Sequence, residues 1–140
     1  MDSTGFVASD NRLVMRNTVI AAITTVVLNL VVYFIGEAAG WIPDQLPERA
    51  DNFGIPAILV STLVPVIAGG IVLTLLIHIT THPVLMFCLI ASVVFIGTLV
   101  APLSVAGSST SFATFLVVLH VITVVVGVAL LIRNVADEPE

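Results

Sequence analysis

The sequence contains no lysine and a single cysteine, and both absences exclude classes of function. Its four cationic side chains are all arginine and stand against nine aspartates and glutamates, so the formal net charge is −5. Nucleic-acid binding depends on a basic surface that neutralises phosphates, and this balance therefore argues against a nucleic-acid partner. Cys88 alone can form neither an intramolecular disulfide nor a CxxC pair, which excludes a thiol-cycling oxidoreductase.

Charge of either sign is scarce. Only 9% of the 140 residues are charged, 59% are hydrophobic, and the mean hydropathy is +1.21. Soluble domains are about a quarter charged, so water is not the main solvent of this surface and the excess apolar side chains are expected to face lipid. At this length one domain is expected, and we interpret residues 1–140 as a single membrane domain.

Four long apolar runs predict four helices. Their predicted ranges are 17–36, 55–78, 83–103 and 112–133, with a polar loop over 37–54. A hydrocarbon core about 30 Å thick requires roughly 20 residues of helix, and lipid leaves backbone groups no partner outside the chain. The predicted fold class is therefore all-α, an integral membrane antiparallel four-helix bundle. Its main partner is the lipid bilayer that surrounds it.

The arginines predict the orientation of this bundle. Arg12 and Arg16 precede the first run, and Arg133 follows the fourth. Loops rich in arginine tend to stay in the cytoplasm, so we predict a multi-pass protein of the plasma membrane with both termini cytoplasmic (N-in/C-in). The acidic loop then faces outward, although Arg49 within it departs from the tendency.

Two polar side chains interrupt the apolar runs at a similar depth. At about 1.5 Å per residue, Asn29 lies roughly 17 Å and His120 roughly 18 Å from the predicted inner boundary. Thr62, Pro65 and Ser92 are expected near the same level. Polar groups inside a membrane are costly and often functional, so this layer is the candidate site.

The layer has a structural interpretation and a functional one. An Asn29–His120 hydrogen bond between helices would satisfy both side chains and contribute about 0.6 kcal/mol, up to about 2. Alternatively, His120 binds a small molecule, a quinone or haem iron, although no second histidine at its depth supplies another axial ligand. A proton relay would need a carboxylate in the membrane, and Glu37 lies at its edge.

His78 and His82 are the remaining histidines. Their i, i+4 spacing can place two imidazoles on one helix face, as in metal sites. Pro83 pushes His82 out of the helical conformation, and no Asp, Glu or Cys lies nearby in sequence. We therefore predict no metal site and treat the pair only as an alternative.

Two short stretches carry a resemblance to a known family. Residues 27–33 (VLNLVVY) in the first run and 119–121 (LHV) in the fourth resemble a family of small four-helix bacterial and archaeal membrane proteins, known as a domain of unknown function. The resemblance implies the topology and an Asn/His pair, and it implies no activity. A looser likeness is to DoxX-type four-helix proteins. A drug exporter resembling the small four-helix multidrug transporters would need a carboxylate within the first helix, and Asn29 carries no charge to exchange.

Two functions follow from the sequence. The first is a non-catalytic accessory or assembly subunit of a larger membrane complex, because the sequence shows no catalytic constellation and has small loops. Its partners would be other membrane subunits or further copies of the chain. The alternative is a small-molecule, haem or quinone-binding membrane protein or transporter with its site at Asn29 and His120. The sequence itself requires no cofactor.

Overall fold

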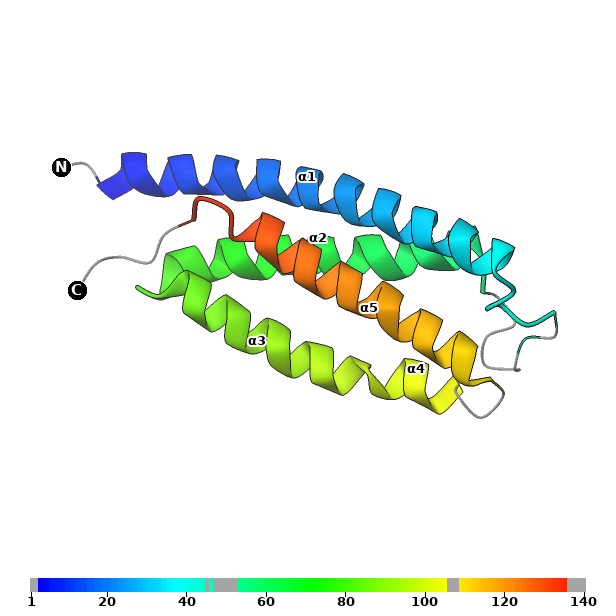
Figure 1. Ribbon diagram of the computed structural model, residues 1–140. Coiled ribbons are helices and arrows are strands. Elements are labelled where there is room, and N and C mark those ends of the chain that lie inside the picture. Colours follow the sequence, from blue (N-terminus) through cyan, green and yellow to red (C-terminus); the bar gives the residue numbers. More distant parts are fainter. Residues whose placement is uncertain (1–2, 45, 47–52, 106–108, 136–140) are drawn as a thin grey trace.

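The computed structural model describes residues 3–44, 46, 53–105 and 109–135, with the side chains of 3–10, 102 and 105 left out. These parts of the chain are helical and contain no strand. The helices are α1 (Ser3–Ala38), α2 (Ile55–Ile79), α3 (Pro83–Thr98), α4 (Val100–Val105) and α5 (Thr110–Leu131). Successive long helices run antiparallel, and α1 begins at the end of the bundle where α5 ends (Figure 1). The predicted all-α four-segment bundle is confirmed.

Three of the described helices are long and apolar enough to cross a membrane. These are residues Asn11–Ala38 of α1, and the whole of α2 and α5. The 16-residue α3 is apolar but short, and only together with α4 does it approach the roughly 30 Å of a hydrocarbon core.

α1 begins much earlier than predicted. The predicted start at residue 17 is wrong, because the helix already begins at Ser3. No proline stands between residues 3 and 38 to end the hydrogen-bond ladder, so the helix continues past its apolar part. The added turns also pack: Val14 is buried in a cluster with Leu73 and Leu131.

The third predicted helix, 83–103, is broken in two. α3 ends at Thr98, and α4 begins at Val100. Pro102 has no N–H to donate to the carbonyl of Thr98, which interrupts the helix at this position. The i to i+4 pattern continues on both sides, with Leu99 N–H donating to Phe95 O at 3.1 Å and Leu103 N–H to Leu99 O at 3.2 Å.

The helices pack around two hydrophobic clusters. One lies toward the chain ends and includes Leu73, Phe87 and Leu131. The other, at the opposite end, stacks Phe112 and Phe115 under the loop residue Phe53. α1 packs extensively against α2 and α5, whereas α3 packs less closely against the same two helices. Space is therefore left on the α3 side of the bundle.

A buried asparagine joins the first helix to the last. Asn17 is 2% exposed, and its Nδ2 donates to Leu131 O at 3.2 Å and to Arg133 O at 2.7 Å. The final carbonyls of a helix have no partner within it, and this side chain satisfies two carbonyls at the end of α5.

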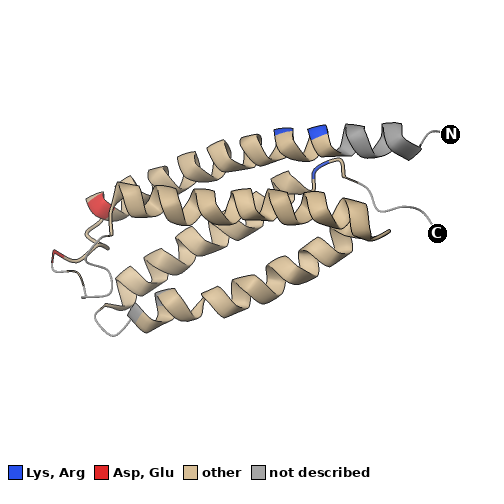
Figure 2. Cartoon of the chain, turned by 180° about the vertical axis from the view of Figure 1, so that it is seen from behind, with Lys and Arg blue, Asp and Glu red and all other residues tan. Residues whose placement is uncertain are grey.

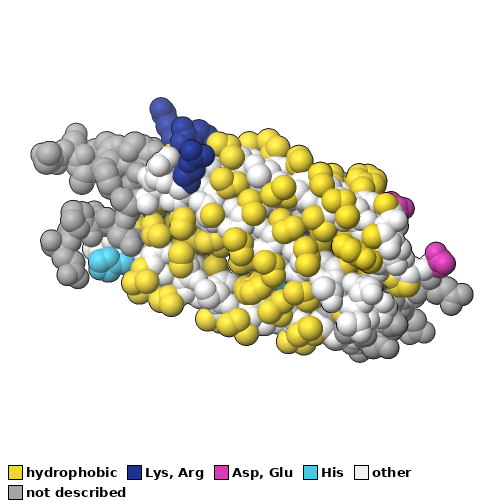
Figure 3. All heavy atoms as spheres, in the orientation of Figure 1, with side chains coloured by type: hydrophobic (Ala, Val, Ile, Leu, Met, Phe, Trp, Pro, Cys, Tyr) yellow, Lys and Arg dark blue, Asp and Glu magenta, His cyan; other side chains and the backbone are white. Residues whose placement is uncertain are grey.

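The described charges lie at the two ends of the bundle. Arg12, Arg16 and Arg133 gather at the end where α1 begins, and Glu37 and Asp44 lie at the other (Figure 2). The face between them is covered mostly by hydrophobic side chains (Figure 3). Such an apolar belt between polar ends is the surface that a bilayer requires.

Candidate functional site

Asn29 forms a buried polar cluster with two threonines. Its Nδ2 donates to Thr62 Oγ1 at 2.8 Å and to Thr123 Oγ1 at 2.7 Å, so that α1, α2 and α5 are joined at one point. Asn29 and Thr62 are each 1% exposed. The Asn29 Oδ1 has no hydrogen-bond partner within the described part of the chain. The cluster is thus a junction of three helices that leaves one acceptor unused.

His120 points to a different neighbour. Its Nε2 lies 2.9 Å from Thr98 Oγ1, at the end of α3. Its ring stacks on Phe95, with the ring centroids 6.0 Å apart and the planes inclined by 24°. The stacking and the hydrogen bond together fix the orientation of the imidazole.

The predicted Asn29–His120 hydrogen bond is therefore wrong. The two residues bond to different partners because α1 packs on α2 and α5, while His120 turns toward α3. Thr123 connects the two regions: it accepts from Asn29, and it also lines the space beside His120.

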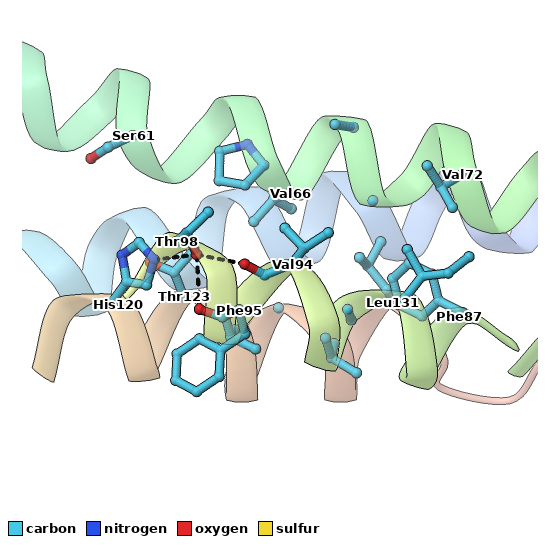
Figure 4. A pocket seen from close by; sticks show the side chains of 18 residues that line it. Ser61, Val66, Val72, Phe87, Val94, Phe95, Thr98, His120, Thr123 and Leu131 are labelled. Carbon is cyan, nitrogen blue, oxygen red and sulfur yellow. Dashed lines mark hydrogen bonds between the residues drawn. The ribbon is translucent and has the colours of Figure 1, made fainter. Parts of the chain in front are cut away.

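A cleft of about 380 Å³ lies between α2, α3 and α5 (Figure 4). Each helix lines it at positions i, i+4, i+7 and i+11, which is one face of a helix over three turns. These strips cover residues 61–72 of α2, 87–98 of α3 and 120–131 of α5. The cleft exists because α3 stands away from the other helices and because small residues occupy its middle, namely Ala68, Gly69, Ala91 and Gly127.

The two ends of the cleft differ in polarity. Ser61, Thr98 and His120 lie at one end, where each strip has its polar residue (Figure 4). Val72, Phe87 and Leu131 lie at the other end, toward the chain termini. Among the residues that the structure describes, no acidic residue, arginine or lysine lines the cleft. It is suited to an uncharged molecule with one polar end.

A family model described as "Family of unknown function (DUF6069)" matches residues 9–137. This chain belongs to the DUF6069 family. No curated protein and no solved structure matches the chain. The DUF6069 match covers every residue of the cleft and of the Asn29 cluster.

The remaining predicted site residues lie in three different places. Pro65 lines the cleft of this DUF6069 protein, and Thr62 belongs to the buried cluster with Asn29. Ser92 is exposed on α3, outside the cleft lining, and its hydroxyl donates to Cys88 O at 2.8 Å. The prediction for Ser92 concerned only its depth along the helix, and the direction of its side chain does not follow from depth.

Thr98 and Thr123 belong to the site, but the sequence did not assign them to it. A signal existed for the two threonines, since each is a hydroxyl inside an apolar run and Thr123 comes one turn after His120. Which helix each one faces depends on the packing order of the bundle, and a run of apolar residues does not specify that order.

The two other histidines lie at the arginine end. His78 Nε2 is 3.2 Å from Nδ2 of Asn11 on α1. His82 precedes α3 with φ −120° and ψ 61°, so it is outside the helical conformation, as Pro83 predicts. Within the described residues no group of three or more His, Cys, Asp or Glu side chains is placed to hold a metal ion.

Proposed function

We propose that the protein is a membrane-embedded binding protein for a small lipid-soluble molecule, held in the cleft between α2, α3 and α5. The observation that carries this proposal is a cleft whose described lining is apolar, with the imidazole of His120 at one end. Ligand sites usually have volumes of about 300–1,000 Å³, apolar walls and a few polar groups that orient the ligand, and this cleft has all three properties.

The state of His120 supports a binding role over a purely structural one. A structural histidine in a membrane needs partners for its polar atoms. Nε2 has Thr98, but Nδ1 makes no hydrogen bond within the described residues. A small molecule with one polar group fits this arrangement. Haem would find one axial imidazole in the cleft, and a transporter would use the same site with a change of access.

Removing the imidazole tests the binding proposal. The protein is extracted from native membranes in mild detergent, and its absorption spectrum and the mass spectrum of its organic extract are recorded for wild type and H120L. We expect one small molecule near stoichiometric amount in wild type and about a tenfold loss in H120L, since a hydrogen bond to a buried group is worth about 1 kcal/mol or more.

The matched control is V125L, a change of similar size at an exposed position of α5. This variant should retain the molecule fully. Equal retention by wild type and H120L, or no stoichiometric molecule in wild type, would contradict the proposal.

A second candidate is the non-catalytic accessory or assembly subunit. The loose packing of α3 favours it, because a helix that few neighbours hold is available to another membrane subunit. The same extraction distinguishes the two, since foreign subunits in fixed proportion to the chain, with no small molecule, support the accessory role.

We also propose that the chain ends are cytoplasmic and that the membrane is the plasma membrane. The support is the separation of Arg12, Arg16 and Arg133 from Glu37 and Asp44 along the bundle (Figure 2). In a C88A background, an impermeant thiol reagent added to whole cells should label D44C and leave R12C unlabelled. The reverse labelling would overturn the orientation.

A further inference from the structure

The cleft has the dimensions of a single extended chain. Each lining strip spans eleven residue steps, so the cleft extends roughly 16 Å along the helices. Its width is limited at the apolar end: a Cβ added at Gly69 would lie 3.1 Å from Leu131 Cδ1 and 3.5 Å from the Phe87 ring. A volume of about 380 Å³ distributed over this length suits one extended hydrocarbon chain.

The hydrogen bonds of Thr98 determine what His120 offers to a ligand. Thr98 Oγ1 lies 2.9 Å from Val94 O and 3.0 Å from Phe95 O, and it donates its only proton to these carbonyls of its own helix. With its proton on a carbonyl, Thr98 is assigned as the acceptor of its contact with His120, and this assignment puts the proton of the neutral imidazole on Nε2. Nδ1 is left as an acceptor at the polar end of the cleft.

The same pattern recurs along the chain, which supports this tautomer. Other threonine hydroxyls in the helices also donate to a carbonyl one turn earlier in their own helix, namely those of Thr18, Thr25, Thr74, Thr114 and Thr123. A free imidazole acceptor requires a donor from the ligand, and an uncharged hydroxyl is the donor that an apolar, charge-free cleft tolerates.

We infer that the cleft binds a neutral single-chain alcohol, whose hydroxyl donates to Nδ1 of His120 and whose chain lies along α2, α3 and α5 toward Phe87 and Leu131. This inference rests on the proposed binding function and names its ligand class. At about 1.2 Å per bond of extended chain, the length corresponds to roughly 12–14 carbons. A carboxylate or an ammonium head is disfavoured, because the described lining of the cleft carries no opposite charge.

The test compares an alcohol, which has a proton to donate, with its methyl ether, in which a methyl group replaces that proton. Radiolabelled 1-tetradecanol and its methyl ether are equilibrated with the protein in bilayer nanodiscs, and binding is corrected for uptake by protein-free nanodiscs. We expect wild type to bind the alcohol about tenfold more tightly than the ether, and H120L to bind both equally weakly.

A second variant separates failure of this inference from failure of the proposed function. A91L fills the cleft from α3 and should abolish binding of both probes, whereas A129L, the same change at an exposed position of α5, should not. Equal binding of alcohol and ether that A91L abolishes would overturn the alcohol inference and leave the binding function standing. Absence of binding by wild type, or binding that A91L leaves unchanged, would overturn both.

Discussion

G70L should force α1 away from α2 and lower the midpoint of thermal unfolding in detergent. Gly70 is buried where the two helices cross closely, and a Cβ added there would contact the Thr18 hydroxyl and lie 2.9 Å from its methyl group. Thr18 is held in place because its hydroxyl donates to Val14 O at 2.8 Å. Overpacking of this kind costs typically about 1–3 kcal/mol, and a leucine adds three carbons beyond the Cβ.

Two further variants show whether the loss comes from this contact. A Cβ added at Gly97 has no atom within 4 Å, so G97L is a matched control and should unfold close to wild type. Combining G70A with T18A removes the opposing hydroxyl and methyl and should recover part of the stability lost in G70A alone. Equal destabilisation by G70L and G97L would show that the contact with Thr18 is not responsible for the loss.

N29D should lower the free energy of unfolding by about 2.5–3.5 kcal/mol at neutral pH, the cost of an aspartate at the centre of a membrane helix. The change keeps the shape of the side chain but removes the two hydrogen bonds that Nδ2 donates to Thr62 and Thr123. It also places a carboxylate where the residue is 1% exposed. The buried charge, more than the lost hydrogen bonds, accounts for the size of the expected loss of stability.

The dependence on pH distinguishes these two causes. A protonated carboxyl is neutral and can donate one hydrogen bond, so the deficit of N29D should shrink in acid and grow as the pH rises. N134D makes the same substitution at an exposed residue in the left-handed conformation, φ 60°, which aspartate also adopts. The free energy of unfolding of N134D should equal that of wild type at every pH. A deficit in N29D that does not vary with pH would assign the loss to the hydrogen bonds alone.

The bundle could be predicted from the sequence because the bilayer demands long apolar helices, and the apolar runs mark them directly. The ends of the helices could not. α1 continues to Ser3 because nothing in residues 3–16 stops its hydrogen bonds, and hydropathy does not report backbone hydrogen bonding. The break after Thr98 follows from Pro102, a residue that the apolar pattern had taken only as the end of a run.

The site was predicted only in part, because the packing of the helices decides which way its side chains point. Rise per residue places Asn29 and His120 at similar depth, but the direction in which each points depends on which helices are neighbours. With α1 against α2 and α5, Asn29 reaches threonines, and His120 reaches Thr98 across the cleft. Which helices are neighbours is decided by the packing of the bundle, and it cannot be derived from the depth of a residue along its helix.

The bonds between Asn17 and the end of α5 also constrain the order of assembly. During synthesis α1 enters the membrane first, and the carbonyls of Leu131 and Arg133 are made more than 110 residues later. Asn29 can meet Thr62 as soon as α2 is inserted, but Asn17 has no acceptor from α5 until the last helix arrives. The contact between the first and the last helix therefore forms only after nearly the whole chain has been translated. A ribosome-bound chain that stops before Thr110 lacks the contact that closes the bundle.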